Sequence, residues 1–130
     1  MNSISKLFYP AARAFLGALF FISGINKIFG FGYVAGWMAS SGVPIPSVLL
    51  VITIMIEVGG GLMLMTGLQS RRVALVFALF LIPVTLVFHA FWSADAASYQ
   101  NQLTQFLKNL AILGGMLLVF DRERSTVSAT

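Results

Sequence analysis

Four apolar segments, each about 20 residues long, constrain this chain more than any other feature of its sequence. They run from about Phe8 to Phe29, from Pro46 to Gly67, from Val73 to Trp92 and from Leu103 to Phe120. At a rise of about 1.5 Å per residue, a helix of this length crosses a hydrocarbon core of roughly 30 Å. The segments lack the alternating pattern of a membrane barrel. The sequence therefore predicts an all-α membrane protein, a four-transmembrane-helix bundle that forms a single domain over residues 1–130.

Composition supports this class and excludes others. Of the 130 residues, 58% are hydrophobic and only 9% are charged. A soluble domain of this size exposes too much surface to be covered by so few charges. The net charge of +4 is therefore read by its position along the chain and not as a sign of nucleic-acid binding. There are no cysteines, which excludes disulfides and thiolate metal sites formed by this chain alone.

The connection between the first two segments, residues 30–46, is longer than the other two. Tyr33 and Trp37 are four residues apart and would share one face of a helix. This spacing predicts a short interfacial helix ended by Gly42 and Pro44. The alternative is a loop that carries two interfacial aromatic side chains.

Basic residues predict the orientation of the chain in the membrane. The N-terminus, the second connection and the C-terminus fall on one side, and they carry Lys6, Arg71, Arg72, Arg122 and Arg124, with Arg13 nearby. The opposite side offers Lys27 and Asp95. Because short cytoplasmic loops are enriched in Lys and Arg, we expect both termini to lie in the cytoplasm.

Charged residues inside the apolar segments are the strongest functional signal. Counting along each helix from the cytoplasmic end places Arg13 at a depth of roughly 8 Å, Glu57 at roughly 15 Å and Lys108 at roughly 18 Å. His89 comes out at roughly 25 Å and Lys27 at roughly 28 Å, near the outer surface. Charges at the midplane usually face the bundle and pair. The depths therefore predict a Glu57–Lys108 ion pair, with Arg13 as the competing partner of Glu57.

These polar residues have a structural and a functional interpretation. In the first, the ion pair only ties helix two to helix four. In the second, the outer half of the membrane contains a polar pocket lined by Glu57, Lys108, Asn109 and His89, with Asn26 and Lys27 at its rim. One histidine without cysteine makes a poor metal site, so we expect no bound metal. The adjacent glycines, Gly59–Gly61 and Gly114–Gly115, predict close helix packing beside the pocket, and Pro83 predicts a kink in the third helix.

Several motifs in this order resemble the DoxX family of small bacterial membrane proteins. They are "ARAFLGALFFISGINKIFGF" (12–31), "ASSGVPIP" (39–46), "IEVGGGLMLMTG" (56–67) followed by Arg71, "FHAFW" (88–92) and "FLKNLAILGGMLL" (106–118). The resemblance covers residues 12–119 and implies a four-helix protein of the bacterial inner membrane. It also implies a link to quinones, because the family is named after a subunit of a thiosulfate:quinone oxidoreductase. Other members are associated with quinone resistance and with redox or thiol stress.

Two functions of different classes follow. The first is a redox-associated subunit, with or without catalysis, whose pocket binds a quinone: Lys108, Asn109 or His89 would donate hydrogen bonds to the quinone oxygens, and Glu57 would accept or relay protons. No motif for a flavin, haem or iron–sulfur cluster is found, so this function needs a redox partner subunit. The alternative is a non-catalytic assembly or scaffold subunit of a membrane complex or homo-oligomer. A small-solute channel is a third, weaker idea, because four helices would form a pore only as an oligomer.

Overall fold

The structure is a computed structural model, and it describes residues 3–129, with side chains as far as residue 123. Most of the described residues lie in helices, and no described residue lies in a strand. Four helical stretches are long and apolar enough to cross a membrane: Ser5–Phe29, Pro46–Thr66, Ser70–Ser93 and Tyr99–Glu123. The predicted class, an all-α membrane protein with four spanning helices, is confirmed. Arg124, one of the basic residues used to predict orientation, has its side chain outside the described part.

The chain divides into two compact units, one up to Val73 and the other from Ala74 onward. The first unit contains η1 (Ser5–Leu7), α1 (Phe8–Phe29), α2 (Phe31–Ser40), α3 (Pro46–Ile54), the π-helix η2 (Met55–Gly60) and α4 (Gly61–Thr66). The second predicted membrane helix is therefore three consecutive pieces, with a π-helical turn in its middle. The unit also includes the start of α5 (Ser70–Phe88).

Local sequence explains where these helices begin and end. Pro46 occupies the first turn of α3, where a missing backbone N–H costs nothing. Gly67 ends α4 with a φ of 85°, in the left-handed region that favours glycine. The helix predicted between residues 30 and 46 is α2, which carries both Tyr33 and Trp37. Its position in the membrane interface stays a prediction.

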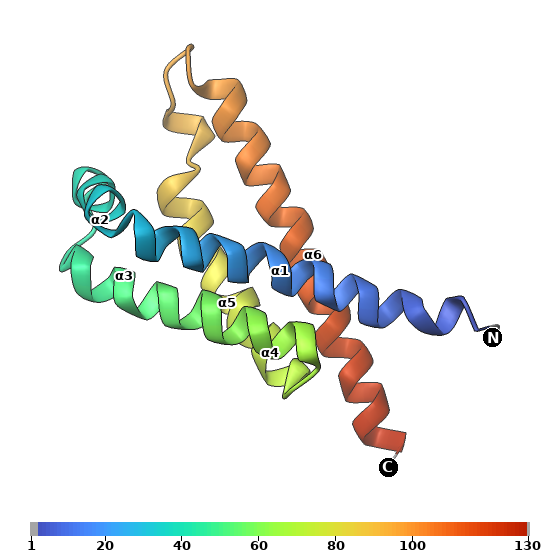
Figure 1. The fold of residues 1–130 in the computed structure, drawn as a ribbon. Helices are drawn as coiled ribbons and strands as arrows, with labels where there is room; N and C mark the ends of the chain where they lie inside the picture. The colour runs from blue at the N-terminus through green and yellow to red at the C-terminus, as the bar shows by residue number, and fades with distance from the viewer. Residues whose placement is uncertain (1–2, 130) are drawn as a thin grey trace. The chain divides into compact units, whose positions relative to one another are not determined.

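Glycines bring α1 and the η2–α4 segment into backbone contact (Figure 1). A Cβ atom at Gly61 would lie 2.7 Å from the carbonyl oxygen of Gly17, and one at Gly24 would lie 2.6 Å from the Val58 side chain. The partner's number falls as the α1 number rises, so the two segments are antiparallel. Gly61 confirms part of the predicted glycine packing. A Cβ at Gly59 or Gly114 would meet nothing within 4 Å. The prediction of close packing is therefore wrong for these two glycines.

The second unit contains most of α5, the short 3-10 helix η3 (Phe91–Ser93) and α6 (Tyr99–Ala129). Pro83 lies inside α5, as predicted. The turn before α6 is held by Asp95, whose carboxylate accepts hydrogen bonds from the backbone N–H and the hydroxyl of Ser98 at 2.9 and 2.7 Å. The Ser98 hydroxyl is the main reason why the pKa of Asp95 is lowered from its ordinary value, and the Ser98 amide adds to it.

Candidate functional site

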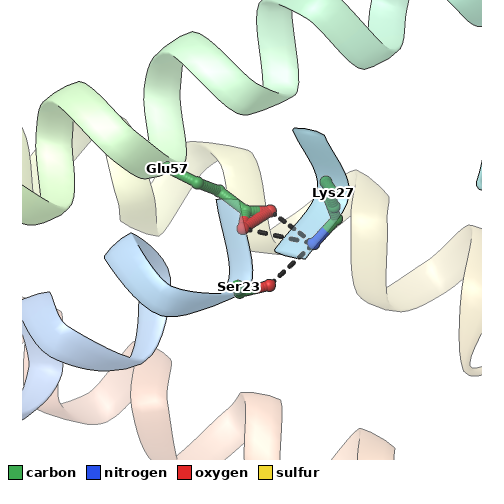
Figure 2. Close-up of polar contacts among 3 residues, drawn as sticks. All are labelled: Ser23, Lys27 and Glu57. Carbon is green, nitrogen blue, oxygen red and sulfur yellow. Dashed lines mark hydrogen bonds and ion pairs between the residues drawn. The ribbon is translucent and has the colours of Figure 1, made fainter. Parts of the chain in front are cut away.

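A buried ion pair joins α1 to the π-helical turn in the first unit (Figure 2). The Lys27 Nζ atom lies 2.9 Å from Glu57 Oε1 and 3.2 Å from Glu57 Oε2. It also donates a hydrogen bond of 2.7 Å to the Ser23 hydroxyl oxygen, one helical turn earlier on α1. The Glu57 side chain is only 5% exposed, whereas that of Lys27 is 27% exposed. The carboxylate is thus enclosed by protein, and the ammonium group reaches its surface.

Glu57 occupies an unusual stretch of backbone. It lies in η2, a π-helix of six residues between two α-helical pieces. In a π-helix each N–H bonds the carbonyl five residues back, which inserts an extra residue into the turn and rotates the side chains that follow. Single π-helical turns of this kind occur frequently at functional sites. The carboxylate that stands out in the sequence is therefore also carried by the least regular turn of its helix.

The predicted partner of Glu57, Lys108, is wrong: the carboxylate binds Lys27 through both oxygens. Lys108 is exposed on α6, in the second unit. The error came from assuming that all four helices start at the same depth. The contacts of Gly17 with Gly61 and of Gly24 with Glu57 and Val58 fix the true register of α1 against η2–α4. In that register Lys27 lies level with the π-helical turn.

Arg13, the competing partner predicted for Glu57, is placed elsewhere. Its guanidinium lies 5.4 Å from the centre of the Tyr9 ring, a cation–π arrangement. A Cβ atom at Gly67 would meet the same guanidinium at 3.0 Å. Because Gly67 follows Glu57 by ten residues, Arg13 belongs to the opposite end of the helix pair from Lys27.

An open groove between α1 and α2 leads to the ion pair from the outside. Its volume is about 490 Å³. The α1 side supplies three polar residues, Ser23, Asn26 and Lys27, and the apolar Leu19 and Ile22; the α2 side supplies Tyr33, Val34 and Trp37. Lys27 is therefore shared: it lines the groove and also binds Glu57 behind it. Asn26 and Lys27 were predicted at the rim of a polar pocket, and both line this groove.

The two other residues predicted for the pocket are bonded within the second unit. The side-chain amide of Asn109 on α6 donates to the Thr85 hydroxyl oxygen on α5 at 3.0 Å. The His89 Nδ1 atom lies 2.9 Å from Gln102 Oε1. It donates a hydrogen bond to this oxygen in the tautomer that carries the proton on Nδ1. Phe106 and Trp92 lie close by and edge-on to one another. A single pocket formed by His89, Asn109, Lys108 and Glu57 stays a prediction.

The sequence matches the family model described as DoxX over residues 9–90. This is more than half of the chain, and it contains Ser23, Lys27 and Glu57. The chain is a member of the DoxX family.

Two curated relatives of this DoxX-family chain come from Escherichia coli K12. The inner membrane protein YqjF is 34% identical over 119 residues, which cover 92% of this chain and 86% of the relative. The inner membrane protein YphA is 28% identical over 127 residues, which cover 92% of this chain and 91% of the relative. No solved structure matches the chain significantly.

The sequence held a signal for the site that depth counting missed. Ser23 and Lys27 are four residues apart on α1, and Gly17 and Gly24 are seven apart, so all four fall near one face of this helix. A face that combines small residues with a lysine is suited to close contact with a helix that carries a carboxylate. Within the described residues, no cluster of three or more His, Asp or Glu side chains is placed to hold a metal ion.

Proposed function

We propose that this DoxX-family protein is an integral inner-membrane protein that binds a quinone in the groove between α1 and α2, as a redox-associated subunit. The observation that carries the proposal is the double role of Lys27, which lines the groove and binds the buried carboxylate of Glu57. The inner-membrane location is supported by the names of the two relatives.

The charge of the site favours a neutral ligand. Lys27 and Glu57 cancel one another, and the remaining polar groups on the groove wall, Ser23 and Asn26, are uncharged. An anionic ligand would meet no net positive charge there and would be close to a buried carboxylate. A quinone is neutral, and its carbonyl oxygens accept hydrogen bonds of the kind that an ammonium or an amide donates.

The shape and lining of the groove favour a ring. Tyr33 and Trp37 face the polar residues across it from α2, and aromatic side chains stack on flat ligands. Leu19 and Ile22 extend the α1 wall with hydrocarbon, which suits the remainder of a lipophilic molecule. A volume of about 490 Å³ lies within the usual range of small-molecule sites, about 300–1,000 Å³.

Glu57 gives the site a role in proton transfer. Reduction of a quinone takes up two electrons and two protons, and the ion pair places an ammonium group at the groove with a carboxylate behind it. Lys27 would hydrogen-bond the quinone oxygen and pass protons to it one at a time, and the ionised Glu57 carboxylate would accept each replacement proton from water and relay it to Lys27. The electrons would come from a redox partner subunit, because the sequence carries no flavin, haem or iron–sulfur motif.

The two tryptophans of the chain make this proposal directly testable. Trp37 lines the groove and Trp92 belongs to the second unit, so Trp92→Phe leaves one reporter at the site and Trp37→Phe leaves one away from it. Titration of decylubiquinone into purified protein should quench Trp37 saturably and Trp92 only in proportion to concentration. Equal, unsaturable quenching of both would contradict the proposal.

Substitutions identify the groups that hold the ligand. A hydrogen bond from a charged donor contributes about 1.5–3 kcal/mol, so Lys27→Met in the Trp92→Phe background should weaken saturable quenching at least tenfold. Lys108→Met is the matched control, since it removes an exposed lysine from α6. If both substitutions weaken binding equally, the loss is one of charge and not of the groove.

The alternative assignment is a non-catalytic assembly subunit, in which the ion pair only locks α1 to the π-helical turn η2. The close glycine contacts favour it, because they already make this helix pair a rigid element. Gentle extraction followed by mass spectrometry separates the two functions. A stoichiometric protein partner without retained quinone supports assembly, and retained quinone supports the redox-associated function.

A further inference from the structure

A second cavity, of about 140 Å³, lies within the second unit between α5 and α6. Six hydrocarbon side chains and two polar ones line it, and none is charged. The hydrocarbon residues are Leu81, Ile82, Leu86, Phe106, Leu110 and Leu113. The polar ones, Thr85 and Asn109, bond to one another at 3.0 Å, which satisfies part of their hydrogen-bonding capacity.

Helix α5 has a local reason to leave space here. Pro83 lies between Ile82 and Thr85, both of which line the cavity. A proline inside a helix removes one backbone hydrogen bond, and its ring clashes with the carbonyl four residues earlier, so the helix bends away from ideal geometry.

The cavity has a buried back and an open mouth. Leu81 and Thr85 are buried at its inner end, 3% and 8% exposed, whereas Ile82, Leu86 and Leu110 are about half exposed. All these residues lie within the two membrane-spanning stretches Ser70–Ser93 and Tyr99–Glu123. The mouth therefore opens at membrane depth, where the surrounding medium is hydrocarbon.

We propose that this cavity binds the acyl chain of a bilayer phospholipid. The lining suits an apolar occupant better than water, since water needs two to four polar partners and the only two polar side chains here partly satisfy one another. The volume is close to that of an apolar cavity of about 150 Å³, lined by similar residues, that stays dry and takes up benzene. A chain that enters from the bilayer through the half-exposed mouth fills the space with matching hydrocarbon. This site lies within the second unit and does not depend on the Lys27 groove.

The test counts lipids that stay bound. Protein reconstituted with palmitoyl-oleoyl phosphatidylethanolamine and phosphatidylglycerol is released into the gas phase, and native mass spectrometry measures the fraction that carries one lipid. Leu113→Trp fills the cavity, and Leu107→Trp makes the same change at an exposed position on α6 outside it. We expect Leu113→Trp to reduce the single-lipid fraction at least fivefold and Leu107→Trp to leave it unchanged. Equal retention in all three proteins, or equal loss in both variants, would overturn the proposal.

Two further measurements separate a filled cavity from misfolding and from headgroup binding. Circular dichroism shows whether Leu113→Trp folds. If it does not, Leu113→Phe, which adds less bulk, replaces it and should also reduce lipid retention. Because the cavity holds the chain and not the headgroup, retention should be the same when phosphatidylcholine replaces phosphatidylglycerol. Retention that follows the headgroup charge and ignores both Leu113 variants would assign the lipid to basic residues and refute the cavity site.

Discussion

The Lys27–Glu57 ion pair predicts a large and asymmetric loss of stability when its two partners are removed separately. At a separation of 2.9 Å, two unit charges attract one another by about 6 kcal/mol at an effective dielectric constant of 20. Desolvation of Glu57, which is 5% exposed, offsets much of this gain in the folded state. The desolvation cost of Glu57 remains when Lys27 is removed. The loss of stability on breaking the pair is therefore larger than the net stabilisation that the intact pair contributes.

Lys27→Met leaves the carboxylate buried without its cation. We expect a loss of about 3–5 kcal/mol in the free energy of unfolding, as for other buried pairs. Glu57→Gln should cost less, about 1–2 kcal/mol, because Lys27 keeps the Ser23 hydroxyl and its 27% exposed side chain can turn to the groove. The double variant leaves no buried charge and should cost about 2–3 kcal/mol, well below the sum of the single changes.

The assay is reversible unfolding in mixed micelles of dodecyl maltoside and sodium dodecyl sulfate, followed by circular dichroism. The matched control pairs Glu57→Gln with Lys108→Met, which removes the exposed lysine that depth counting had selected. These two changes should add to within about 0.5 kcal/mol. If Lys27→Met and Glu57→Gln also add within that margin, the two groups do not interact and the reasoning from the ion pair fails. The same test with Arg13→Met should give additivity, because Arg13 lies beside Gly67.

Three other measurements follow from the fold. Gly61→Ala should lower the free energy of unfolding by about 1–3 kcal/mol, because its Cβ would meet backbone atoms of α1 at 2.7 Å. Gly59→Ala is the control and should change it by much less, because its Cβ would meet nothing within 4 Å. Equal effects would argue against the glycine contact. A reporter active only in the periplasm, fused after Thr130, should stay silent, because the distribution of basic residues predicts that both termini lie in the cytoplasm. A strong signal would contradict this topology. In the Trp92→Phe protein, Trp37 should be quenched more by lipids labelled near the headgroup than by lipids labelled at the chain ends; the opposite depth profile would remove α2 from the interface.

Most of the fold could be predicted from the sequence because each membrane helix must satisfy its own backbone hydrogen bonds. Length and hydropathy alone therefore located the four spanning stretches, and Tyr33 and Trp37 marked a separate helix between the first two. The π-helical turn at Met55–Gly60 had no such signal. Its six residues, MIEVGG, lie within a continuous apolar segment that predicts one regular helix.

The candidate site was predicted only in part. Glu57, Lys27 and Asn26 were selected because charged and polar side chains are costly in a membrane helix and therefore usually functional or paired. Ser23, whose hydroxyl oxygen accepts a hydrogen bond from Lys27, was missed. Burying a hydroxyl in a membrane helix costs little free energy, so it gives no comparable signal in the sequence. Thr85, the partner of Asn109, was missed for the same reason, and Gln102, the partner of His89, was missed because it precedes the fourth predicted segment.

The sequence by itself predicted that Glu57 pairs with a cation, and the tertiary structure decided which one. The need is local, because a carboxylate surrounded by Ile, Val, Gly and Leu cannot be solvated by its neighbours along the chain. The choice depends on how far α1 is shifted along the η2–α4 segment, and residue counting cannot supply that shift. Close contact sets it, because Gly17 lies against Gly61 and Gly24 lies against Glu57 and Val58. That register brings Lys27 to the π-helical turn and places Arg13 beside Gly67.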